Sequence, residues 1–588
     1  MIEEAFFREW IEAGCGEVGQ VWVGLVIAHG GLHNNHGDRG AALESAQQLS
    51  VPELGRLQRA RINTPVMLRT SREAYPIAEP ASATAEPAII IERACLSMPK
   101  HGLYALVGEF VHLAWPAVIR NMLNCAADRA TLSFVGHWDE SVAHYDGAGL
   151  GKMYSNITGL SIGLGLSKGL ATLCSQAHGA GRGADRNGLY LRQCALWMCV
   201  ALLYAIAAAV YAEPILLALA QPAAVAHASA RFAQVQLFGV PFFWASFALQ
   251  TVCDGGCQDT RPGLYSNLAS SAAQLVLCVL AVHPKLLNWG YLGMAAARSA
   301  GGVLQFGLLV AIIISQKRQA LVWRRAQYAG RPLERALTRH GLCTFLAVAL
   351  PSACILWVEW WSFELQCLIV GLLPNATVLL AAHGTLFNLV AIAYMTFTGL
   401  GTALCALTGK YVGKGAAATV PRLCAIAVAL ALALSLSISG ALYGLRRPLG
   451  HLFTTDAAVV NAIDENMLGV SLGVPPYAIL MTLYGACIGT NQRAWPFAGT
   501  LIGYAIGLPL AYYLARVRQW PRPLMGVWLG NAAALGFAAL CVIAFVVCKD
   551  WKRVRAVSSG GDTRDDRLLS EEEAMAAQAA SVQEDPRR

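Results

Sequence analysis

Charged side chains are scarce in this sequence. Only 14% of its 588 residues are Asp, Glu, Lys or Arg, whereas 56% are hydrophobic, and the mean hydropathy is +0.47. In soluble globular proteins about a quarter of the residues are charged. The shortage of charge excludes an ordinary soluble protein and predicts an integral, multi-pass membrane protein whose main partner is the lipid bilayer.

The sequence also lacks the patterns that mark metal, disulfide and transferase sites. Its 17 cysteines show no CxxC pairing, so we interpret them as small buried apolar residues rather than as a zinc or disulfide framework. Paired DDxxD motifs and a catalytic histidine in a Ser- or Asp-rich loop are absent as well. We therefore expect no metal, no cofactor and no enzyme, with a polytopic membrane transferase as the alternative of another class.

Long apolar runs fill the middle of the chain. As a helix, each run can cross roughly 30 Å of hydrocarbon while it satisfies its own backbone polar groups. The sequence therefore predicts an all-α membrane protein with twelve spans, at residues 104–134, 150–177, 188–211, 233–253, 264–283, 290–314, 343–373, 377–408, 420–443, 468–490, 496–515 and 524–548.

An internal repeat relates the first six spans to the last six. Five pairs of residues in matching local sequences lie 234 or 235 positions apart: Pro116 and Pro351, Gly181 and Gly415, Pro214 and Pro448, Pro241 and Pro475, Gln258 and Gln492. Because six is an even number, both units start on the same side of the membrane. A pseudo-two-fold axis along the membrane normal then relates them, as in many secondary transporters.

Charge and hydropathy divide the chain into five parts. A polar N-terminal extension at 1–95 is followed by an N-lobe at 104–314, a basic linker at 315–342, a C-lobe at 343–548 and a tail at 549–588. If the N-terminus lies in the cytoplasm, the even-numbered connections between spans, above all residues 316–340, and residues 549–555 hold most of the Lys and Arg in the loops. That distribution follows the positive-inside rule, which places the linker and the start of the tail in the cytoplasm. A net charge of +8 beside a membrane needs no nucleic acid to explain it, and we expect a monomer.

Several motifs are similar to those of one known family. They are FVGH at 134–137, TLCSQAHGAGR at 172–182, CQDTRP at 257–262, LPSACILWVEWWSFEL at 350–365 and GKYVGKG at 409–415. With them, residues 104 to 549 resemble the multidrug and toxin extrusion (MATE) transporters of eukaryotic type, which carry a Glu-Trp-Trp-x-aromatic-Glu signature in the seventh span.

The resemblance implies a V-shaped fold of two lobes and an antiporter that works by alternating access. Such a protein exports small organic solutes, above all organic cations and xenobiotics, in exchange for protons. An organic-anion or citrate exporter, sodium as the coupling ion, and a flippase for lipid-linked substrates of the same superfamily stay open as alternatives. The plasma membrane and a vacuolar or other organellar membrane are both compatible with the sequence.

The seventh span carries two acids, Glu359 and Glu364, beside Trp360 and Trp361. An ionised carboxylate at membrane depth is costly, so a proton and a cation compete to neutralise it, which is the minimal chemistry of an antiporter. Tryptophan rings can hold a flat organic cation, at about 0.5 to 2 kcal/mol. The two acids lie about 140° apart around a helix, so either one faces the cleft and the other a neighbouring helix, or the helix bends. The resemblance favours Glu359 as the coupling residue.

Other polar residues within the spans are candidates for the substrate cleft. In the first span Asn121, Asn124 and Asp128 follow the spacing i, i+3 and i+7, which places them on one helix face. Asp128 has two interpretations: an acid that acts in transport, or a partner in an ion pair with Arg129, Arg120 or Lys168. Lys168 is unusual within a span, and we expect it to form a pair or to extend toward the membrane surface.

In the C-lobe the resemblance indicates three further positions. Asn388 occupies a position where animal members carry a glutamate and plant members often carry an amide. Tyr394 matches a cleft-lining tyrosine, and Tyr477 stands where many relatives have an acid. Without those two acids the argument for a dicationic substrate is weaker.

Overall fold

The computed structural model describes residues 100–557 apart from 139–140, 220, 324–337, 454–455 and 519–520. Every regular element in this part of the chain is a helix, as the sequence predicts. The predicted N-terminal extension, the middle of the basic linker and the tail beyond residue 557 lie outside the described residues.

The N-terminal half, residues 100 to 315, contains the first six spans. Its elements are α6 (Lys100–Trp138), α7 (Val142–Ser155), η2 (Asn156–Leu160), α8 (Ser161–Gly179), α9 (Gly183–Val210), α10 (Ala212–Ala218), α11 (Ala223–Leu237), α12 (Val240–Thr251), η3 (Val252–Gly256), α13 (Arg261–Val282) and α14 (Gly290–Ser315). The short helix α15 (Gln319–Trp323) begins the linker.

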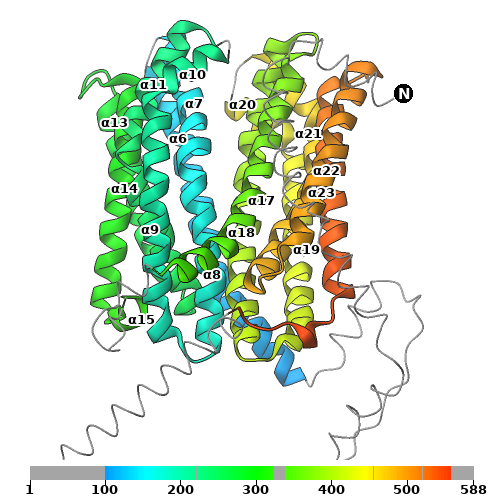
Figure 1. Cartoon of the computed structure of the whole chain (residues 1–588). Coiled ribbons are helices and arrows are strands. Elements are labelled where there is room, and N and C mark those ends of the chain that lie inside the picture. The colour runs from blue at the N-terminus through cyan, green and yellow to red at the C-terminus, as the bar shows by residue number, and fades with distance from the viewer. Residues whose placement is uncertain are drawn as a thin grey trace, which may run out of the picture. The chain divides into compact units, whose positions relative to one another are not determined.

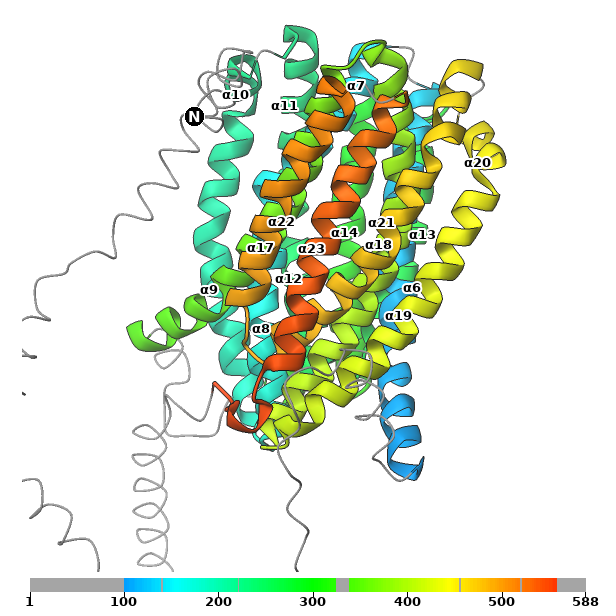
Figure 2. The same cartoon turned by 90° about the vertical axis from the view of Figure 1, so that its right-hand side faces the viewer.

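The C-terminal half, residues 339 to 548, contains the other six. Its elements are α17 (Arg339–Gly371), α18 (Ala376–Gly413), η4 (Ala417–Thr419), α19 (Val420–Gly444), α20 (Arg446–Phe453), α21 (Ala457–Gly489), α22 (Ala494–Tyr512), η5 (Tyr513–Val517) and α23 (Pro523–Cys548), followed by η6 (Trp551–Arg553). Figure 1 shows the two halves as two groups of helices. Figure 2 shows α22 and α23 side by side on one flank, where they pack together.

The twelve predicted spans are confirmed in the described residues. Eleven helices are long and apolar enough to cross a membrane, and α11 with the helix 240–256 forms a twelfth span that bends by 52°. The prediction of a fourth span at 233–253 was wrong at its start, because this span begins at residue 223 and breaks before Val240. Polar residues such as Arg231 and Gln234 in its first helix lower the local hydropathy and hide the true start.

The repeat extends to the backbone. Gly181 and Gly415 both end a span in the left-handed conformation, with φ of 75° and 74°, which a residue without a Cβ adopts most readily. Pro116 and Pro351 both lie inside the first helix of their half. The helices α10 and α20, which hold the next proline pair, follow the third span of each half.

The two halves are hydrogen-bonded to each other near the linker end, where α14 ends and α17 begins. The Thr172 hydroxyl of α8 donates to the carbonyl of Ile488 at 2.7 Å, and the Gln176 amide donates to the carbonyl of Gly489 at 2.9 Å. Lys410 of α18 forms an ion pair with Glu109 of α6. These bonds join α8 to α21 and α6 to α18, so they close this end.

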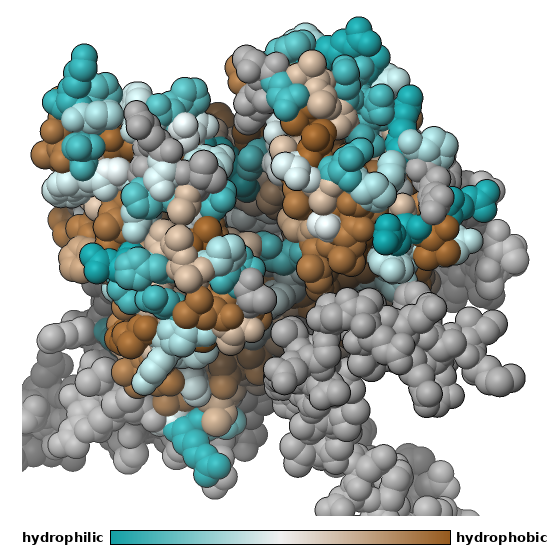
Figure 3. All heavy atoms as spheres, turned by 90° about the horizontal axis from the view of Figure 1, so that it is seen from above, coloured by the Kyte–Doolittle hydropathy of each residue, from teal (hydrophilic) through white to brown (hydrophobic). Residues whose placement is uncertain are grey.

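At the opposite end, which carries α10 and α20, the molecule is hollowed. Figure 3 looks down on this α10 end and shows the hollow between the two halves. If the linker is cytoplasmic, as its charge predicts, the hollow opens away from the cytoplasm.

Candidate functional site

One face of α17 contacts another helix in its lower part and becomes more exposed toward the α10 end. The Trp357 indole donates to the Ser161 hydroxyl of α8 at 3.1 Å, so this face of α17 meets the N-terminal half there. Trp361 and Glu364 follow on the same face, four and seven residues later. Trp361 is 40% exposed and Glu364 is partly exposed. Trp360 lies at the edge of this face and is partly buried.

Glu359 points in another direction, into the C-terminal half. Its side chain is buried, with 6% of its surface exposed, and it accepts a hydrogen bond from the Tyr477 hydroxyl of α21 at 2.8 Å. The ring of Tyr477 stacks on that of Tyr394 from α18, with 3.6 Å between the ring centres. The structure therefore separates the two acids, as their angular spacing predicts: Glu359 faces a neighbouring helix, and Glu364 lies on the more exposed face.

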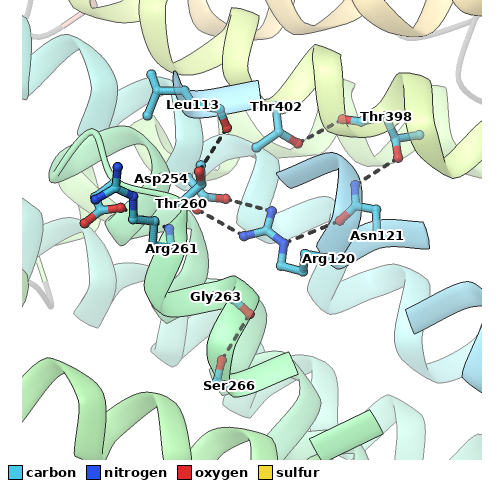
Figure 4. A network of polar contacts seen from close by, with 11 residues as sticks. Leu113, Arg120, Asn121, Asp254, Thr260, Arg261, Gly263, Ser266, Thr398 and Thr402 are labelled. Carbon is cyan, nitrogen blue, oxygen red and sulfur yellow. Dashed lines mark hydrogen bonds and ion pairs between the residues drawn. The ribbon is translucent and has the colours of Figure 1, made fainter. Parts of the chain in front are cut away.

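Asn121 belongs to a polar network between the halves, which Figure 4 shows. Its amide donates to the Thr398 hydroxyl of α18 at 3.0 Å. The neighbouring Arg120 forms a two-pronged ion pair with Asp254 of η3, with nitrogen to oxygen distances of 3.1 and 2.9 Å. Asp254 is a buried helical residue whose charge Arg120 neutralises.

Asp128 has different partners from those that the sequence indicated. Its carboxylate lies 2.7 Å from the Lys152 Nζ of α7 and 3.3 Å from the Arg298 Nε of α14. Lys152 also donates to the Asp128 carbonyl at 2.9 Å. The expected pair with Arg129, Arg120 or Lys168 was wrong, because the next helix, α7, and the more distant α14 supply the nearest bases.

Arg129 crosses to the other half of the molecule. Its guanidinium donates to the side-chain oxygen of Asn388 in α18 and lies 5.4 Å from the centre of the Phe387 ring. Asn124, one turn earlier on α6, is exposed. The structure thus brings the predicted residues Asp128 and Asn388 to one region through Arg129.

Lys168 forms no ion pair within 4 Å among the described residues, so its expected pairing is not observed. Lys152 and Arg298 were missed by sequence reasoning. Each is a base inside an otherwise apolar span, in GLGKMYS and MAAARSAGG, and that rarity was the signal that could have found them. In the described part of the chain, no group of three or more His, Cys, Asp or Glu side chains is placed to hold a metal ion.

Comparison with known proteins agrees with this architecture. The MatE family model matches residues 116–280 and 351–513, and the starts of these two segments coincide with the first proline pair of the repeat. Multidrug and toxin extrusion protein 2 of Oryctolagus cuniculus is 25% identical over 452 residues, which cover 75% of this chain and 70% of that protein. Protein DETOXIFICATION 36 of Arabidopsis thaliana is 24% identical over 445 residues, covering 75% and 85%.

Solved structures share the fold. The crystal structure of the eukaryotic MATE transporter AtDTX14 superposes with a TM-score of 0.69 at 22% identity, covering 77% of this chain and 98% of that one. These relatives are transporters and not enzymes. On the match of the family model to both halves, the chain belongs to the MATE family of multi-pass membrane transporters.

Proposed function

We propose that this transporter exports small organic solutes in exchange for protons, and that Glu359 carries the exchanged proton. The observation that carries the proposal is a buried carboxylate on a membrane-spanning helix, with no ion pair to a base within 4 Å among the described residues. An ionised carboxylate in that position is costly unless a proton or a cation neutralises it. Protonation and deprotonation of Glu359 can therefore be coupled to the change between a state open to one side of the membrane and a state open to the other.

The surroundings of Glu359 favour a proton over an organic cation as its partner. Tyr477, which donates a hydrogen bond to Glu359, and Tyr394, which stacks on Tyr477, are each only 2% exposed. A proton can reach a carboxylate in such packed surroundings more readily than an organic molecule can. Trp361 and Glu364, on the more exposed face of α17, are better placed to contact a solute.

The test is transport by the full-length chain in proteoliposomes with separately imposed proton and sodium gradients. Glu359→Gln keeps the hydrogen bond acceptor but removes the titratable group, so we expect it to abolish proton-driven efflux. Glu364→Gln is the matched control on the same helix, and we expect it to change affinity for the solute more than coupling. Efflux by Glu359→Gln at the rate of the unaltered chain would refute the proposal.

The charge of the solute separates two candidates. The tryptophans and acids of α17 support an organic cation, as the sequence led us to expect. The bases around Asp128 support an organic anion, the second candidate. An uptake panel of organic cations, organic anions and citrate distinguishes the two.

A further inference from the structure

Two bases pair with a single acid in the N-terminal half, and a third base follows that acid in the sequence. Lys152 and Arg298 both lie within ion-pair distance of Asp128, and Arg129 follows Asp128 in α6. Among the described residues, Asp128 is the one acid within 4 Å of any of these three bases. Two positive charges of this cluster are therefore left without a neighbouring counter-charge.

Surplus charge in this place is costly. The side chains of Lys152 and Arg298 are each only 8% exposed, and both lie on helices that span the membrane. Removing a charge from water costs several kcal/mol unless an opposite charge and hydrogen bonds compensate for it. Asp128 can compensate for one of the three bases. The cluster is thus arranged to accept another anion.

Unused hydrogen-bond donors occur in the same cluster. Nη1 of Arg298 and Nε of Arg129 are buried and have no hydrogen-bond partner in the described structure. Buried polar atoms are normally paired. A guanidinium holds its donors in a planar fork that fits a carboxylate, with two parallel bonds. Each of the two arginines therefore keeps one unpaired donor for an anion, whereas Nη2 of Arg298 already donates to the Asn156 side chain at 3.0 Å.

The cluster lies at one depth below the hollow at the α10 end. With a rise of 1.5 Å per residue, Asp128, Lys152 and Arg298 are each about 12 to 15 Å from the ends of their helices on that side. Arg129 reaches from this cluster to Asn388 of the other half, so the cluster lies where the two halves meet. Even if Glu364 faces the same region, the three bases of the cluster outnumber the two acids, Asp128 and Glu364.

We propose that Arg129, Arg298 and Lys152 form a binding site for the carboxylate of an organic anion. Arg129 contacts the carboxylate directly and gives up its bond to Asn388, while Arg298 and Lys152 supply the charge behind it. The identification of this anion as the exported solute rests on the proposed function. The site itself does not, because it concerns binding alone.

Binding without any gradient tests the site. The purified full-length chain is titrated against fluorescein, which carries negative charge at pH 7.5, and against rhodamine 123, a cation on the same xanthene scaffold, with fluorescence anisotropy as the readout. We expect the unaltered chain to bind fluorescein. We expect Arg129→Gln to weaken that binding at least tenfold, which corresponds to about 1.4 kcal/mol, and to change rhodamine 123 binding less than about twofold.

Two further variants distinguish a binding role from a structural role. Asp128→Asn raises the positive surplus, so we expect it to tighten fluorescein binding, whereas a purely structural network would lose binding. If Arg129→Gln does not purify as a monodisperse protein, Asp128→Asn decides alone. Arg553→Gln is the control, because it removes an arginine whose side chain is 87% exposed beyond the last span, and we expect no change.

Three results would overturn the site: no fluorescein binding by the unaltered chain, equal weakening of both dyes in Arg129→Gln, or weaker fluorescein binding in Asp128→Asn. A separate experiment tests the proposed function. Glu359→Gln is expected to keep fluorescein binding while it loses proton-driven export. Normal export by Glu359→Gln would refute that coupling role and leave the anion site standing.

Discussion

Among single side chains, the hydroxyl of Tyr477 makes the closest polar contact to Glu359. We expect Tyr477→Phe to slow proton-driven efflux several-fold, because a buried acceptor that loses its partner costs about 1 to 3 kcal/mol, while the ring stack on Tyr394 is kept. Tyr484→Phe is the matched control, since that hydroxyl pairs with Thr500 instead. Initial efflux rates at several pH values provide the measurement, and equal losses in both variants would contradict a specific role for Tyr477.

At this same scale the sequence indicated candidate residues but not their contacts. The EWWSFE run, the polar face of the first span and Asn388 could all be found as polar groups among apolar ones. The partners of Asp128 could not, because Lys152 and Arg298 reach it only through the packing of α7 and α14 against α6. For the same reason, the sequence could place Glu359 and Glu364 on different faces but could not say which of them Tyr477 would cover.

At the scale of helices, α8 packs closely against α17 through Gly165 and Gly169, which lie four residues apart in the sequence. A Cβ at Gly169 would lie 2.6 Å from the Cβ and 2.7 Å from the Cα of Ala349, which forces the two helices apart. We therefore expect Gly169→Leu to lower the free energy of unfolding by about 1 to 3 kcal/mol, a typical cost of overpacking. Thermal unfolding of the detergent-solubilised chain measures it. Gly307→Leu is the control, because no atom lies within 4 Å of that position, and an equal loss there would contradict the close packing.

The sequence predicted the presence of each helix more accurately than it predicted the residues at which the helices begin and end. Runs of about 20 apolar residues identify spans on length and hydropathy alone. The start of α21 was predicted at 468 but lies at Ala457, because Asp464 and Glu465 lower the hydropathy of its first turns. These acids lie near Arg446 and Arg522, and such contacts appear only once the chain is folded.

For the whole molecule, the bonds at the linker end join the two halves to each other. Glu109→Lys places two lysines side by side across the halves and should open this end. We expect maleimide labelling of the buried residues Cys405 and Cys487 to rise about fivefold, since 1 kcal/mol changes an equilibrium by about that factor. Mass spectrometry of the labelled peptides gives the result.

The reciprocal exchange is the control for that experiment. Adding Lys410→Glu to Glu109→Lys restores an ion pair with its ends swapped, so protection of both cysteines should return. The exposed residue Cys548, at the end of the last span, should react equally in every variant. If the double variant labels like the single one, the ion pair does not hold the halves together.

The bend in the fourth span has a mechanical consequence. Its counterpart α21 carries Pro475 and Pro476 yet runs unbroken from Ala457 to Gly489, whereas the first copy bends by 52° before Val240. A continuous helix resists bending along its whole length, whereas a helix pair with a break can bend at the break. The two copies of this span should therefore differ in stiffness, with the rigid copy in the C-terminal half and the hinged copy in the N-terminal half.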